Sequence, residues 1–516
     1  MSESAINPIL KCDYPDPDVI RVDDTYYMVS TTMYFMPGGA VLRSYDLKNW
    51  EIVSYIFDSL DDTPQERLDM EFSNYAGGMW APCFRYKDGV FHVIFVSHFT
   101  QTTYHFTTKD IAGSWKKSTI KGYYHDCSLL FDDNGKNYLV YGNREIHLVE
   151  LDKDLTGPVE GTDKVIIREP EGYEGLGHEG AHFYKINGKY YIFTIHWPKG
   201  GMREECCFIS DSVDGEYVGE TVFCDDRGVS GQGVAQGGII DTPSGKWYAV
   251  LFQDSGAVGR IPVLLPVSWD KEKPVFGVNG KVPSRMEIAS SRPYYRYEPL
   301  FTSDSFELDD EAEADKPSLK LQWQWNHVPD DSNWYIKPEG GLAIKTGKIA
   351  SNLTYAKNTL TQRMMYPKCE AEVTVDGTGL NEGDVAGLCA LQGTYGFLAV
   401  TKHAGNYFLI KVVRDNSNAP AKIGASGDFL PGEVVDKIRL SGPKVTLCLK
   451  PNFENMQDKL DFFYLKEDGK WAKVGNAIKL YFRLDHFTGC RFGLFVYSTR
   501  KTGGEAVFTD FKYRYE

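Results

Sequence analysis

Apolar and polar residues alternate in short runs along the first half of the chain, and turn residues separate these runs. Five segments share one pattern, a short apolar strand, a turn with Asp, Asn or Gly and an aromatic-rich strand, and begin at Asp16, Ala81, Asp126, Glu179 and Gln236. Turns such as KDG, DNG and NG are strong hairpin signals. The segments start about 45 to 65 residues apart, which suits the four strands of a propeller blade. Five repeats predict a five-bladed β-propeller.

The repeat stops after GRIPVLLPVSWDKEKPVFG, and the following pattern is different. Residues 290–317 carry Pro, Ser and an acidic run, a composition typical of a domain boundary, so we place a linker near residues 290–305. Beyond it, short alternating strands such as GLAIKTG, CEAEVTV and YFLIKVV continue without a blade repeat, which indicates a jelly-roll-like β-sandwich. We therefore predict an all-β protein, with a catalytic propeller over residues 1–295 and an accessory sandwich over residues 305–516.

Composition narrows the classes of function. The 516 residues suffice for two or three domains. The net charge of -15 argues against binding nucleic acid or anionic membranes, whereas a neutral sugar fits. The sequence contains no signal peptide pattern and no membrane span, so we expect a cytoplasmic protein. Ten scattered cysteines suggest neither a disulfide framework nor a CxxC metal site. The sequence leaves the oligomeric state open.

Acidic residues recur at one place in the repeat. Asp16, Asp126 and Glu179 each stand before the first strand of their hairpin, in blades 1, 3 and 4. Because the innermost strands of a propeller surround its axis, we expect these carboxylates to meet. Glycoside hydrolysis needs two carboxyl groups, and crowding raises the pKa of at least one. A single such acid is more often an ordinary turn residue, but three in register favour a site; Glu171 and Glu174 are rival candidates.

Several motifs give a more specific resemblance. They are NPILKCDYPDPDV, MWAP, HDCSLLFDDNGKNYLVYG, HEGAHFYKINGKYYIF and GRIPVLLPVSW. With them the chain resembles glycoside hydrolase family 43, whose members are five-bladed propellers that hydrolyse xylosides and arabinosides with inversion. The segment Leu321 to Ile344 resembles the opening of the sandwich in the family's β-xylosidase-type members. The resemblance implies an exo-acting enzyme that releases L-arabinofuranose, D-xylose or both from arabinoxylan- or xylan-derived oligosaccharides.

The resemblance also implies roles for individual residues. By position, Asp16 is similar to the family's general base and Glu179 to its general acid. Asp126 is similar to the residue that modulates the pKa of the acid and orients it. Arg260, in the GR pair before the closing apolar strand, matches an arginine that contacts the sugar or the acid.

Two further positions concern sugar binding and metal binding. Trp80 in MWAP offers an apolar face on which a sugar can stack, although a lone Trp at a strand start is more often a core residue. Many family members carry a His where this chain has Gln236, and that His helps to hold a calcium ion or a water cluster on the axis. Gln can ligate calcium through its carbonyl oxygen, so we retain a structural calcium ion at Gln236 as an expectation. Catalysis itself should require no cofactor.

Three other functions compete with this interpretation. His178, Glu179 and His182 spell HExxH, a zinc peptidase motif that functions only on a helix. Here the flanks are Gly-rich and predict a hairpin, and in an extended chain the two histidines would stand about 13 Å apart. A non-catalytic carbohydrate-binding protein would not need three carboxylates in register. A retaining fructan-type hydrolase would share the propeller, but the chain lacks the motifs NDPNG and RDP.

Overall fold

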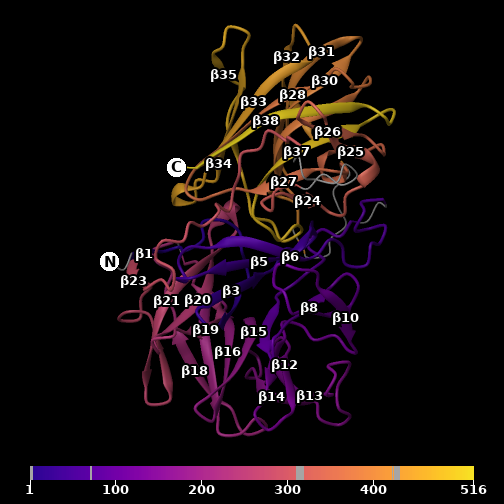
Figure 1. Ribbon diagram of the computed structural model, residues 1–516. Coiled ribbons are helices and arrows are strands. Elements are labelled where there is room, and N and C mark those ends of the chain that lie inside the picture. Colours follow the sequence, from indigo (N-terminus) through magenta and orange to yellow (C-terminus); the bar gives the residue numbers. More distant parts are fainter. Residues whose placement is uncertain are drawn as a thin grey trace.

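A computed structural model describes residues 4–69, 73–229, 231–308, 319–420, 422 and 430–515. The described part consists of strands and loops with four short 3-10 helices, and it forms two units stacked on each other (Figure 1). The prediction of an all-β protein is confirmed. Residues 309–317 of the predicted boundary segment lie outside the described residues. Among the described residues, no helix is long and apolar enough to cross a membrane.

The first unit is a propeller of five four-stranded antiparallel sheets. Blade 1 contains β2 (Asp18–Val22), β3 (Thr25–Ser30), β5 (Gly38–Ser44) and β6 (Glu51–Phe57). Blade 2 contains β7 (Cys83–Lys87), β8 (Val90–Ser97), β9 (Thr102–Thr108) and β10 (Lys116–Ile120). Blade 3 contains β11 (Ser128–Phe131), β12 (Asn137–Tyr141), β13 (Glu145–Leu151) and β14 (Lys164–Arg168). The remaining blades follow the same order along the chain.

Blade 4 contains β15 (Gly175–Ile186), β16 (Lys189–Pro198), β17 (Glu204–Ser210) and β18 (Val218–Phe223). Blade 5 contains β19 (Ala235–Asp241), β20 (Trp247–Asp254), β21 (Arg260–Asp270) and β22 (Lys273–Phe276). The first strands β2, β7, β11, β15 and β19 contact one another in a closed ring. These are therefore the inner strands, and the five predicted hairpins are confirmed.

The second unit is a sandwich of two antiparallel sheets. One sheet contains β24 (Gln324–Asn326), β27 (Leu360–Arg363), β29 (Asp384–Leu391), β30 (Tyr395–His403), β31 (Asn406–Arg414), β32 (Glu433–Arg439) and β37 (Arg491–Ser498). The other contains β25 (Trp334–Ile336), β26 (Leu342–Lys345), β28 (Cys369–Asp376), β33 (Lys444–Asn452), β34 (Lys459–Leu465), β35 (Trp471–Lys473), β36 (Ile478–Lys479) and β38 (Glu505–Tyr515). The predicted sandwich is confirmed.

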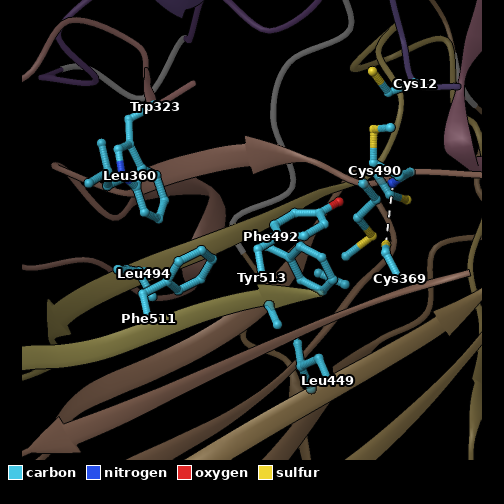
Figure 2. Packing of buried hydrophobic residues seen from close by; sticks show 14 of the residues in the cluster. Cys12, Trp323, Leu360, Cys369, Leu449, Cys490, Phe492, Leu494, Phe511 and Tyr513 are labelled. Carbon is cyan, nitrogen blue, oxygen red and sulfur yellow. Dashed lines mark hydrogen bonds between the residues drawn. The ribbon is translucent and has the colours of Figure 1, made fainter. Parts of the chain in front are cut away.

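The two units share strands and core. From the propeller half, β4 (Phe35–Met36) pairs with β24 at the edge of a sandwich sheet. Two further strands, β1 (Ser4–Ile6) and β23 (Arg285–Glu287), pair with each other. One hydrophobic cluster contains side chains of both units, and Figure 2 shows Cys12 of the N-terminal segment together with Phe492 and Tyr513 of the sandwich. Since burial of this shared apolar surface stabilises both units, we expect them to hold a fixed relative position.

Candidate active site

The inner end of each blade determines where the predicted acids lie. Asp16 and Asp126 adopt left-handed backbone conformations, with φ of 51° and 47°, two residues before the first paired residue of β2 and β11. The equivalent position in blade 4 is Gly180, with φ of 65°. Glu179 lies one residue earlier, inside β15, so the expectation that it shares the position of Asp126 is wrong by one residue.

Gly180 lies close to a residue of the next blade. A Cβ atom on Gly180 would lie 2.7 Å from Cγ of Gln236, and the positive φ is itself unfavourable for most other residues. A larger side chain at Gly180 would require the side chain of Gln236 to move, and the acid of blade 4 lies on the preceding residue, Glu179. β15 also contains register shifts on both sides of Glu179, and such irregularities redirect a side chain next to a site.

Asp16 forms an ion pair with Arg260 at the start of β21. Arg260 Nη1 donates to Asp16 Oδ1 and Oδ2 at 3.1 and 3.3 Å, and Thr31 Oγ1 donates to Oδ2 at 2.7 Å. Both Asp16 and Arg260 are buried. The charged guanidinium and the hydroxyl stabilise the negative charge of this carboxylate and fix its orientation.

Asp126 lies in a different environment. Burial raises the pKa of Asp126, and the carboxylates of Glu179 and Asp16 raise it further, whereas His125 and Arg260 oppose them, so that the pKa is about 7. Its Oδ1 is buried without a hydrogen-bond partner. The carboxylates of Glu179 and Asp16 therefore lie close enough to Asp126 to disfavour its negative charge.

His125 lies between the two acids of blades 3 and 4. Its Nδ1 is 3.6 Å from Asp126 Oδ1, and its Nε2 is 3.6 Å from Glu179 Oε2. Burial alone would lower the pKa of His125, but Asp126, Glu179 and Asp16 outweigh burial and raise it to about 9. The imidazolium therefore offsets part of the negative charge of the site near neutral pH.

Glu179 is the most exposed of the three acids, since its side chain keeps 17% of its surface accessible. Its Oε2 accepts a hydrogen bond from Asn143 Nδ2, which lies in the turn between β12 and β13. The rival acids lie elsewhere, because Glu174 pairs with Lys199 at 2.6 Å on the surface and Glu171 is exposed. Glu179 is thus the acid of this segment that the fold brings to Asp126.

The sandwich contributes a residue to the site. Phe487 lies with its ring centroid 4.4 Å from the guanidinium carbon of Arg260 and 5.4 Å from the ring of Trp80. Trp80 is buried, and its indole also contacts the rings of His98 and His125. The predicted binding residues Trp80 and Arg260 therefore border the acids, and Phe487 packs against both.

Three residues of this site were not predicted from the sequence: His125, Asn143 and Phe487. His125 directly precedes Asp126, so its position in the HDCS motif was a usable signal. No sequence signal indicated Asn143 or Phe487, because Asn143 reaches the site from a turn of blade 3 and Phe487 reaches it from a loop of the sandwich.

Gln236 lies where the axial calcium ion was expected. It is buried, and its backbone N–H donates to Glu205 Oε2 at 2.7 Å. Calcium at Gln236 stays a prediction, and no step of the proposed mechanism depends on it.

The zinc peptidase interpretation is wrong. His178 and His182 lie on strand β15 and not on a helix. His182 Nδ1 bonds the carbonyl oxygen of Gly180 and its Nε2 approaches Asp18 at 3.8 Å, whereas His178 Nδ1 bonds Thr194 Oγ1. The two imidazoles thus have different partners.

Comparison with known proteins identifies the family. The family model described as "Glycosyl hydrolases family 43" matches residues 5–274, just over half of the chain. The model described as "Beta xylosidase C-terminal Concanavalin A-like domain" matches residues 312–514.

Individual proteins agree with these matches. A "Beta-xylosidase" of Formosa agariphila is 27% identical over 99% of this chain and 90% of its own, and a "Xylosidase/arabinosidase 43B" of Humicola insolens is 26% identical over 98% and 97%. A solved "Bifunctional GH43-CE" structure from Bacteroides eggerthii superposes on 100% of this chain with a TM-score of 0.90 and 39% identity; the chain spans 64% of that protein. The chain therefore belongs to family 43 of the glycoside hydrolases, as its motifs predicted.

Proposed function

We propose that this glycoside hydrolase is an inverting, exo-acting enzyme that releases one pentose, D-xylose or L-arabinofuranose, from the ends of short xylan- or arabinoxylan-derived oligosaccharides. The observation that carries the proposal is the assembly of Asp16, Asp126 and Glu179 from three different blades around His125. The names of the relatives, which include both xylosidase and arabinosidase, support a pentoside substrate.

Each acid has a separate role in the proposed mechanism. Asp16 accepts a proton from a water molecule that attacks the anomeric carbon on the face opposite the leaving group. Glu179 donates a proton to the glycosidic oxygen as its bond to the anomeric carbon breaks. The greater exposure of Glu179 suits contact with a departing sugar. Asp126, close enough to interact electrostatically with both, tunes and orients the acid. Water thus enters as the product hydroxyl, and the anomeric configuration is inverted.

The sandwich supports exo action. Phe487 packs beside Trp80 and Arg260 at the edge of the acids. An aromatic side chain in this place leaves less room for a polymer to extend past the site, and it favours binding of a chain end. Trp80 and Phe487 also offer aromatic surface to the apolar face of a pentose.

The proposed function is tested with purified protein on chromogenic β-xylosides, chromogenic α-L-arabinofuranosides and sucrose. We expect hydrolysis of one or both pentosides and none of sucrose. Proton NMR of the sugar formed first reports the anomeric configuration. Retention of configuration would instead make Asp16 a nucleophile and favour the fructan-type mechanism. Binding without turnover on every glycoside would favour a carbohydrate-binding protein.

The proposed cellular location and partners follow from the same class of substrate. We place the enzyme in the cytoplasm, where imported oligosaccharides are its only expected partners. The ten cysteines are unpaired, and free thiols of this kind persist in a reducing compartment. Cell fractionation with an antibody against the protein tests this location.

A further inference from the structure

A second cluster of ionisable side chains lies in blade 4 and includes none of the three acids. It contains Glu169, His178 and His196, which we call the blade 4 triad. His196 Nε2 is 3.4 Å and His178 Nε2 is 3.6 Å from the same carboxylate atom, Glu169 Oε1. The two imidazoles stack with centroids 4.5 Å apart, and potential ligand atoms of all three residues lie within 4.8 Å of one another.

The remaining ring nitrogens are already engaged. His196 Nδ1 lies 2.8 Å from Glu204 Oε1, and His178 Nδ1 lies 3.0 Å from Thr194 Oγ1. Because a carboxylate can only accept, His196 Nδ1 must carry the proton, and in the neutral ring Nε2 then presents a lone pair. That Nε2 is buried and has no hydrogen-bond partner. A carboxylate on the far nitrogen, as at His196, is an arrangement that orients metal-binding histidines.

The charge balance of the cluster is negative. Glu169 and Glu204 both contact His196, and among the described residues neither pairs with a lysine or an arginine. One ring nitrogen of each histidine and an oxygen of Glu169 therefore lie within 4.8 Å of one another, and a divalent cation there would offset the charge of the two glutamates.

We propose that the blade 4 triad binds a divalent cation of the zinc class. Neutral imidazole and carboxylate are ligands that zinc accepts, at about 2.0–2.2 Å. Ligands at these lengths around a tetrahedral ion lie about 3.3–3.5 Å apart, close to the 3.4 and 3.6 Å separations observed. A water molecule completes the fourth position. Calcium, which prefers six to eight oxygen ligands, does not suit the two nitrogens.

This site differs from the HExxH zinc peptidase motif in its ligands and in its role. It takes only His178 from that motif and adds residues from the β14 to β15 connection and from β16. The ion would link Glu169 to β15 and β16 of blade 4, which carry His178 and His196. Since His178 directly precedes Glu179, the proposed acid, the ion would also restrain the backbone that carries this acid.

The test uses the full chain, stripped of metal with a chelator and then titrated with Zn²⁺ alone by calorimetry. His196→Asn is the informative variant, because the amide can keep the N–H that faces Glu204 while the ligand nitrogen is lost. His147→Asn is the matched control, since His147 Nδ1 likewise bonds a carboxylate, Asp163, at 2.8 Å but belongs to no such triad. Glu169→Gln is a second variant that can keep the hydrogen bond from the backbone N–H of His178 to Oε1.

We expect the wild type and His147→Asn to bind one more equivalent of Zn²⁺ than His196→Asn, whose affinity at this site should fall by at least about 100-fold. Glu169→Gln should weaken binding as well, and Zn²⁺ should raise the melting temperature only where the triad is intact. Ca²⁺ should not compete. Binding of equal stoichiometry and affinity in both triad variants, or no binding by the wild type at millimolar Zn²⁺, would overturn the proposal. Neither result depends on hydrolysis, so the proposed function is tested separately.

Discussion

Replacement of Glu179 gives the sharpest test of the proposed mechanism. If Glu179 protonates the glycosidic oxygen, Glu179→Ala should be most harmful for natural oligosaccharides, whose sugar leaving groups need that proton. A nitrophenyl glycoside should suffer less, because nitrophenolate is already a stable anion. The ratio of the two losses therefore reports proton donation and not binding.

The magnitude follows from the contacts of Glu179. Loss of general acid catalysis reduces turnover of a natural substrate by about 10²–10⁴-fold, which is about 2.7–5.4 kcal/mol. Removing the side chain also frees Asn143 Nδ2, but water can reach this partly exposed position, so that cost is about 1 kcal/mol and falls on both substrates equally. We therefore expect a loss below about 10-fold on the nitrophenyl glycoside. Glu179→Gln can keep the bond to Asn143 and should show the same contrast.

The assay compares kcat and kcat/KM of wild type and variants on xylobiose, an arabinosylated oligosaccharide and the matching nitrophenyl glycosides. Glu174→Gln is the matched control, because this acid is exposed and pairs with Lys199, and it should retain wild-type rates. Equal losses on both kinds of substrate, with binding preserved, would refute proton donation by Glu179. A selective loss in Glu174→Gln would move that role to Glu174.

The remaining predictions concern the other site residues. Asp16→Asn should reduce turnover by about 10²–10⁴-fold while sugar binding, measured by calorimetry, is preserved; more than a tenth of wild-type turnover would remove Asp16 from the base role. His125 should titrate near pH 9 in NMR spectra, and Asp126→Asn should lower that pKa, because Asp126 is the largest influence that raises it. The stabilisation from the raised pKa of His125 is present below pH 6.5 and is lost as the pH rises through about 9, so His125→Asn should flatten this part of the melting-temperature profile; an unchanged profile would contradict it. Phe487→Ala should lower kcat/KM by about 2- to 10-fold, since an aromatic contact contributes about 0.5–1.5 kcal/mol, and unchanged kinetics would place Phe487 outside the substrate's reach.

Local signals explain how much of this protein could be predicted from its sequence. The hairpins were predictable because turn and strand are encoded within about 15 residues, and five repeats of one pattern determine the architecture. Glu179 was expected at the position equivalent to Asp126, which Gly180 occupies instead. The repeat does not encode the close approach of Gly180 to the side chain of Gln236 in the next blade. The residue pattern of one hairpin does not predict such contacts between neighbouring blades.

The position of Phe487 shows why the sandwich cannot be treated as an appended module. One carboxylate of the N-terminal segment, Asp13, accepts hydrogen bonds from the backbone N–H of Arg260 at 2.7 Å and from that of Gly489 at 2.8 Å. This single side chain therefore connects the strand that carries the arginine paired with Asp16 to the sandwich loop that carries Phe487. The loop fits closely there, because a Cβ atom on Gly489 would lie 2.2 Å from the carbonyl oxygen of Val258. Since the same junction fixes the ion pair of the proposed base and the aromatic residue beside it, removal of the sandwich should disturb the chemistry of the propeller as well as its stability.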